Sequence, residues 1–158
     1  MRRLRIALSL SALALVLAAS PAEARRGGGA RTRADSTSLA LGLGADYLVD
    51  PEVGELQLTL ALETPIARGL TVGARLGALV TSEPTKVGAP IDLRLRLRTH
   101  GLYFDGLIGP WLLFDSGDTL RFHGGFGFGI LTGAMSLGLE VGALDRSGII
   151  GLRLAFSV

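Results

Sequence analysis

The sequence contains no cysteine, and only one of its 16 basic residues is a lysine. Without cysteine the chain forms no disulfide, offers no thiolate to a metal, and lacks the residue to which a bacterial lipoprotein attaches its lipid. Its two histidines show no metal-ligand spacing, so we expect neither a metal nor a cofactor. The shortage of lysine argues against an ordinary solvated protein surface, where lysine and glutamate are normally abundant.

A long apolar run occurs only near the N-terminus. Three arginines fall within the first five residues, residues 6–19 are apolar apart from two serines, and Ala22-Glu23-Ala24 has the small-x-small form of a cleavage site. These features predict a secretory signal peptide over residues 1–24, cleaved after Ala24. A membrane-spanning helix needs roughly 20 apolar residues, which is more than this run provides.

The rest of the chain is balanced in charge. Without the signal peptide it holds 13 Lys+Arg and 13 Asp+Glu, so the basic pI of the whole sequence is no evidence for nucleic-acid binding. Residues 25–35 are polar, glycine-rich and basic, and we expect them to form a flexible N-terminal segment. The remaining residues, 36–158, are enough for one domain.

Residues 91–99, with the sequence IDLRLRLRT, alternate between apolar and charged side chains. A helix with its period of 3.6 would scatter these side chains around its surface, whereas a strand places them on two opposite faces. Similar alternation recurs in seven further segments, which are separated by clusters of turn-forming residues. The eight segments are 38–49, 55–63, 70–80, 91–99, 102–114, 120–130, 135–143 and 150–158.

The number and length of these segments favour a membrane barrel. A tilted membrane-spanning strand needs about 9–11 residues, and bacterial single-chain barrels use an even number of strands. We therefore predict an all-β fold, an eight-stranded antiparallel up-and-down transmembrane β-barrel over residues 36–158. The alternation is least regular at Pro110, which cannot donate a ladder hydrogen bond, so we expect a bulge or strand end that turns Trp111 to either face.

The two faces of the predicted strands differ sharply in composition. One is almost purely Leu, Val, Ile and Phe, and the other mixes balanced charges with Gly, Ala, Ser and Thr. An arginine at the bilayer midplane costs about 2–4 kcal/mol, so we place the charged face inside, where an arginine fills the space beside a glycine on a facing strand. The predicted lumen charge network consists of Asp46, Glu55, Glu63, Arg75, Asp92, Arg94, Arg96, Arg98, Asp105, Arg121, His123, Glu140 and Arg153. We expect Arg94 and Arg96 to pair with acids such as Asp105, Glu55 and Glu140, because buried charges must be paired.

From about Ser36 to Val158 the chain resembles the small outer-membrane barrels of the OmpA and OmpX type. The resemblance is one of pattern: a signal peptide, eight strands of two-residue periodicity, a charged lumen and an apolar last strand carrying Phe156. It implies insertion into the outer membrane of a Gram-negative bacterium by the barrel assembly machinery, among outer-membrane lipid and lipopolysaccharide. We expect a monomer with a structural or accessory role and no catalytic activity.

Three alternatives stay open at this point. A soluble, lipocalin-like periplasmic barrel would bind an apolar ligand among inward-facing leucines. A lipid-modifying barrel enzyme would need a general base, for which His123 is the candidate, although no serine motif lies beside it. A narrow channel would need an open lumen. The stretch HGGFGFG at 123–129 lacks the Lys-Ser/Thr pair of a phosphate-binding loop, so we assign it no nucleotide.

Overall fold

The structure is a computed structural model that describes residues 37–50, 52–114 and 120–158. The predicted signal peptide, its cleavage after Ala24 and the predicted flexible segment 25–35 lie outside the described residues, so they stay predictions. No helix among the described residues is long and apolar enough to cross a bilayer.

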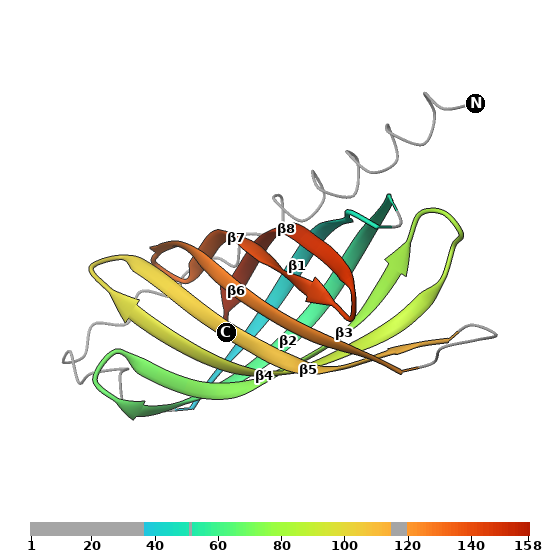
Figure 1. The fold of residues 1–158 in the computed structure, drawn as a ribbon. Coiled ribbons are helices and arrows are strands. Elements are labelled where there is room, and N and C mark those ends of the chain that lie inside the picture. Colours follow the sequence, from blue (N-terminus) through green and yellow to red (C-terminus); the bar gives the residue numbers. More distant parts are fainter. Residues whose placement is uncertain (1–36, 51, 115–119) are drawn as a thin grey trace. The chain divides into compact units, whose positions relative to one another are not determined.

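Eight antiparallel strands form a closed barrel, as predicted. Each strand pairs with its neighbours in sequence, and the last strand returns beside the first to close the sheet (Figure 1). The strands are β1 (Ser38–Leu48), β2 (Val53–Ala67), β3 (Leu70–Thr81), β4 (Val87–Thr99), β5 (Leu102–Leu113), β6 (Leu120–Thr132), β7 (Met135–Leu144) and β8 (Ser147–Ser157). Closure leaves the described strands without an unpaired edge, which is what a bilayer interior requires.

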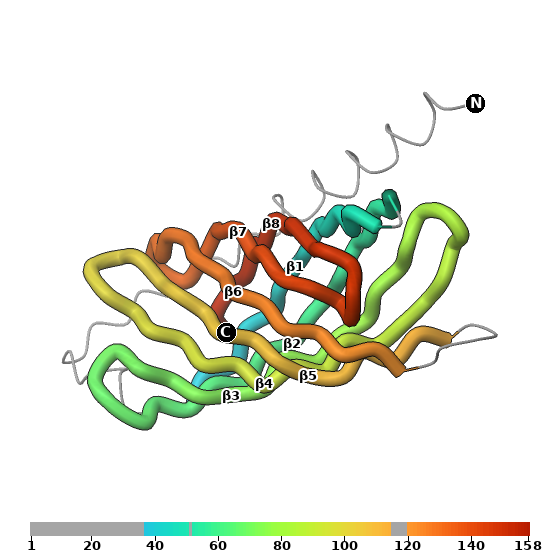
Figure 2. The backbone as a smooth tube through the Cα atoms, in the orientation of Figure 1, coloured from blue at the N-terminus to red at the C-terminus, as the bar shows by residue number. Residues whose placement is uncertain are grey.

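The two ends of the barrel carry different connections. At one end, which we call the turn end, the strands are joined by two-residue turns at 68–69, 100–101 and 133–134 (Figure 2). His100 and Gly101 both have positive φ, the backbone conformation that tight hairpins of two residues use. The opposite end, the loop end, carries the connections 49–52, 82–86, 114–119 and 145–146.

The alternating side chains are sorted by face. Apolar residues point away from the barrel axis, and Leu93 at 66% and Ile108 at 64% are among the most exposed of them. Charged residues of the same strands point inward, so that Asp92 is fully buried between two exposed neighbours in sequence. The leucines of IDLRLRLRT therefore face outward, and a lipocalin-like barrel with inward leucines does not describe this chain.

The predicted irregularity at Pro110 is wrong. The register between β4 and β5 is the same on both sides of this residue, since Pro90 pairs with Trp111 and Leu93 pairs with Ile108. Pro110 itself faces outward and is paired with Phe122 on β6. Its missing N–H leaves out one hydrogen bond of the ladder, and no extra residue is inserted in the strand. The alternation continues unbroken, and the Trp111 side chain lies inside the barrel with no exposed surface.

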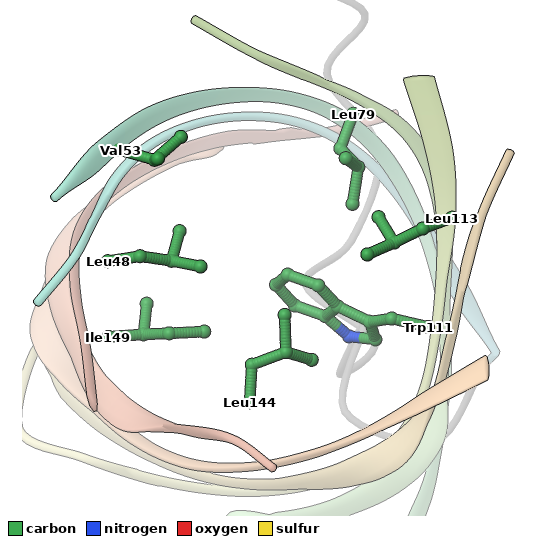
Figure 3. Packing of buried hydrophobic residues seen from close by; sticks show 7 residues of the cluster. All are labelled: Leu48, Val53, Leu79, Trp111, Leu113, Leu144 and Ile149. Carbon is green, nitrogen blue, oxygen red and sulfur yellow. The ribbon is translucent and has the colours of Figure 1, made fainter. Parts of the chain in front are cut away.

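An apolar cluster fills the interior near the loop end (Figure 3). Its members come from six different strands and point toward one another across the lumen. The cluster consists of Leu48, Val53, Leu79, Trp111, Leu113, Leu144 and Ile149. The sequence interpretation missed it, because the inward face was taken to be polar along its whole length. Packed apolar side chains thus occupy the lumen near the loop end.

The outward placement of Leu95 generates a prediction. Leu95 lies within β4 and is 48% exposed, so Leu95→Arg puts a charge on the apolar outer face, whereas Leu95→Phe keeps that face apolar. The charge is expected to cost about 2–4 kcal/mol in a bilayer and to lower the folded, membrane-inserted yield strongly. The measurement is the fraction of protein that inserts and runs as a folded, heat-modifiable band. Equal yields for the two variants would contradict the assignment of the faces.

Candidate functional site

Below the apolar cluster, the interior is occupied by ion pairs, most of them between neighbouring strands, while Arg75 and Glu140 join β3 to β7 across the lumen. The ion pairs form two groups. The loop-side group consists of Asp46, Arg75, Asp92, His123, Glu140 and Arg153. The turn-side group consists of Glu63, Arg94, Arg96, Arg98 and Asp105.

Two arginines organise the loop-side group. Arg75 on β3 lies 2.7 Å from Asp92 through Nη2 and 2.7 Å from Glu140 through Nη1. Arg153 on β8 donates from Nη2 to Glu140 Oε1 at 2.9 Å, and its Nη1 lies 2.6 Å from Asp46 Oδ1. Glu140 on β7 is therefore held by two guanidinium groups, and charge-assisted contacts of this kind are stronger than neutral hydrogen bonds.

Asp92 joins these arginines to an aromatic pair. Its Oδ1 accepts hydrogen bonds from Trp111 Nε1 at 3.2 Å and from His123 Nδ1 at 2.8 Å. The Trp111 and His123 rings are packed together with centroids 4.6 Å apart. The other ring nitrogen of His123, Nε2, lies 3.6 Å from Glu140 Oε1, so the imidazole is placed between two carboxylates. The His123 side chain is fully buried at this position.

The turn-side group is centred on Asp105 and Glu63. Arg96 donates to Asp105 from Nε at 2.7 Å and from Nη2 at 2.8 Å, which is a two-point contact. Arg94 donates to Asp105 from Nε at 3.1 Å and also lies 3.0 Å from Glu63. Arg98 Nη2 lies 2.5 Å from Glu63 Oε2, and the Arg98 side chain is 35% exposed. The turn-side group is therefore partly open to its surroundings at Arg98, near the turn end.

The predicted pairing of Arg94 and Arg96 is right for Asp105 and wrong for Glu55 and Glu140. Glu140 is held by Arg75 and Arg153 instead. Glu55 lies closer to the loop end, two residues from the apolar cluster member Val53, where it accepts a hydrogen bond from Gln57 Nε2 at 2.7 Å.

Arg121 is also placed differently from the prediction. Its side chain is 27% exposed, and its Nε lies 4.0 Å from Asp145 at the loop end. The reason is that Arg121 pairs with Trp111 on β5, at a level of the barrel that the apolar cluster occupies. The structure therefore brings eleven of the predicted residues into the two groups and leaves Glu55 and Arg121 outside them.

Two aromatic residues that the sequence interpretation did not assign to the interior complete it. Trp111 donates a hydrogen bond to Asp92, and the Arg96 guanidinium lies over the Tyr103 ring, with Arg96 Cζ 4.2 Å from the ring centroid. Both share the phase of Asp105 in the two-residue alternation, since all three occupy odd positions of β5. This phase was the signal that could have placed them inside.

Glycines make room for these large side chains. Gly44 on β1 is paired in register with Arg153 on β8. A Cβ atom at Gly44 would lie 2.7 Å from Arg153 Nη1. A Cβ at Gly138 would lie 2.1 Å from the Tyr103 hydroxyl. The expectation that an arginine fills the space beside a facing glycine thus describes Gly44 and Arg153.

Little free space is left in the middle of the barrel. A cavity of about 30 Å³ lies between the two groups, lined by Arg75, Arg94, Arg96, Tyr103 and Glu140 among others. A buried water needs about 10–15 Å³ measured in this way, so this cavity has room for isolated waters and not for a continuous column. Among the described residues, no three His, Cys, Asp or Glu side chains are grouped so as to hold a metal ion.

Comparison with known proteins shows the class of fold. No family model matches the chain, and no curated protein matches it. A de novo designed transmembrane β-barrel superposes with a TM-score of 0.61 at 13% identity, covering 77% of this chain and 95% of the design. The outer-membrane enzyme PagL superposes with a TM-score of 0.56 at 11% identity, covering 75% of this chain and 98% of PagL. The chain has the fold of the eight-stranded transmembrane β-barrels.

The double engagement of Arg75 yields a prediction for stability. Arg75→Met removes the charge and leaves Asp92 and Glu140 each short of a buried partner, which is expected to cost about 3–5 kcal/mol. The matched control is Arg146→Met in the exposed connection 145–146, where a change within about 0.5 kcal/mol is expected. Urea unfolding in detergent, followed by the fluorescence of Trp111, measures both. Equal unfolding midpoints would mean that the interior ion pairs do not stabilise the barrel.

Proposed function

We propose that this protein is a structural or accessory β-barrel of a bacterial outer membrane, with a closed lumen and no catalytic activity. The observation that carries the proposal is the inverted placement of side chains, with apolar residues outside and paired charges inside. A soluble barrel buries its apolar face, whereas a barrel in lipid exposes it.

The outer membrane is favoured by the architecture. Barrels of this membrane carry short turns on the periplasmic side and longer loops on the outside. The turn end of this chain carries only two-residue turns, and the longest connections are at the loop end. We propose that the turn end faces the periplasm and that the barrel assembly machinery inserts the chain. We further propose that the protein is a monomer surrounded by outer-membrane lipid and lipopolysaccharide.

A closed lumen is favoured over a narrow channel. The apolar cluster fills the loop end, and the two ion-pair groups fill the middle. Eight strands enclose an interior only wide enough for side chains, so a pore would require these groups to move apart. The Arg75–Glu140 ion pair, which joins β3 to β7 across the lumen, opposes such a movement.

A structural role is favoured over catalysis because of how His123 is held. Its Nδ1 is bound to Asp92, its ring packs against Trp111, and its side chain has no exposed surface. No lipid substrate reaches a base in that position without opening the barrel. His100 lies in an exposed turn, where its Nδ1 contacts the Thr99 hydroxyl at 2.9 Å.

Cell fractionation tests the location. We expect the protein in the outer-membrane fraction and soluble only with detergent, because the exposed apolar face needs lipid or detergent. We also expect its measured mass to be that of a mature chain beginning at Arg25. A known periplasmic protein from the same cells is the control. Recovery of the folded protein in the detergent-free periplasmic extract would remove the proposal.

Planar-bilayer recording tests the closed lumen. The purified protein is expected to produce no large, stable conductance steps, because packed side chains leave no continuous water column. A general porin reconstituted in the same lipid shows that the assay detects open channels. Reproducible steps from this protein would move the assignment to a channel.

A further inference from the structure

The outer face of the barrel is hollowed near the turn end. A groove of about 410 Å³, which we call the outer groove, crosses β5, β6 and β7 and reaches β8. Two rows of exposed apolar side chains flank it, and the members of each row are paired in register on neighbouring strands. The row nearer the turn end consists of Leu102, Ile130 and Leu137. The second row consists of Phe104, Phe128, Leu139 and Leu152.

The floor of the outer groove is backbone that the barrel interior supports. Tyr103, Gly129 and Gly138 are paired in register between the two rows, and the two-residue alternation directs their side-chain positions inward. The Tyr103 ring packs directly behind this floor, since a Cβ atom at Gly138 would overlap its hydroxyl. The Arg96 guanidinium lies over the same ring and belongs to the turn-side group. The groove is therefore a preformed feature with packed side chains behind it.

The dimensions of the outer groove suit a single hydrocarbon chain. The two rows are two residues apart along each strand, about 7 Å, so their side chains leave a furrow about one chain wide. From β5 to β8 the groove spans three strand spacings, which is about 14 Å. A helix of a partner protein is about 10–12 Å across with its side chains, which is too wide to reach the floor.

The surroundings of the outer groove indicate what fills it. Every outward-facing side chain that lines it is apolar, so water finds no hydrogen-bonding side chain there, and an empty groove forgoes dispersion contacts along its walls. The groove is continuous with the exposed apolar face, which is the lipid-facing surface of a transmembrane barrel. Lipid tails are as apolar as leucine, so close packing along the walls is what distinguishes a chain held here from the surrounding lipid.

We propose that the outer groove binds one acyl chain of a phospholipid from the leaflet at the turn end. Leu102 directly follows the turn 100–101, and Leu137 lies near the start of β7, so the groove opens close to that end. The acyl chain lies between the two rows and packs against the rings of Phe104 and Phe128. The acyl-chain site rests on the transmembrane fold alone. The choice of phospholipid over lipopolysaccharide rests on the proposed function, in which the turn end faces the periplasm.

The test is whether a phospholipid stays with the barrel when the protein leaves the membrane. The protein is extracted and washed in a steroid-based detergent, which has no long alkyl chain to compete for the groove, and its mass is measured by native mass spectrometry. One phospholipid per barrel is expected to remain bound. Leu137→Trp and Leu139→Trp each add a bulky ring to one of the two rows, and both are expected to release most of this lipid. Leu58→Trp, on the outer face of β2 away from the groove, is the matched control and is expected to retain it.

The unmodified protein alone can overturn the proposal, so the result does not depend on whether the groove variants fold. Absence of bound lipid from the unmodified barrel overturns it, and so does full retention of lipid in both folded groove variants. Equal release by Leu58→Trp assigns the lipid to the outer face in general and overturns the groove as a site. Lipopolysaccharide retained in place of phospholipid overturns the phospholipid assignment. A retained phospholipid in a barrel that fractionation places outside the outer membrane supports the groove while removing the proposed function.

Discussion

The rest of this structure depends on one constraint, which is that charged side chains turned inward by the strands need partners inside a lumen only as wide as the side chains that fill it. The outer wall is apolar, so it offers no place for these groups. The consequence is a set of ion pairs between different strands, one of which crosses the barrel. Arg75 and Glu140, 65 residues apart in sequence, lie 2.7 Å apart in space.

This constraint also explains the composition of the inward face. A guanidinium group needs more room than one strand position gives, and glycines on neighbouring strands provide it, as Gly44 does for Arg153. Arginine is better suited than lysine to this environment, because its planar group donates to two carboxylates at once, as Arg75 does. The single lysine of the chain lies in the connection 82–86, outside the strands.

Much of the fold could be predicted from the sequence because strand periodicity is a local property. Alternation in a stretch such as 91–99 is enough to tell which residues share a face, and the lipid cost of arginine tells which face is inside. The partners inside could not be predicted in the same way. The stagger between strands sets which inward residues meet across the lumen, and a single segment carries no information about it, so Glu140 was assigned to the wrong arginines.

Two further errors have local causes. Pro110 suggested a break in β5, but a proline that faces outward removes one ladder hydrogen bond and leaves the register intact. The apolar cluster was missed because its members lie near strand ends, where alternation is short. Leu48 and Val53, for example, flank the connection 49–52. At these positions an inward leucine is indistinguishable in sequence from the beginning of a loop.

The contact between Arg153 and Asp46 has a consequence for how the barrel forms. These residues lie on the last and the first strand, which become neighbours only when the sheet closes on itself. Arg153 also holds Glu140 on β7, so an open sheet leaves Asp46 without its cation at the free edge of β1. Ring closure and charge neutralisation are thereby the same event. This makes an incompletely closed barrel electrostatically unfavourable. The last strand pairing is therefore favoured to form in a single cooperative step.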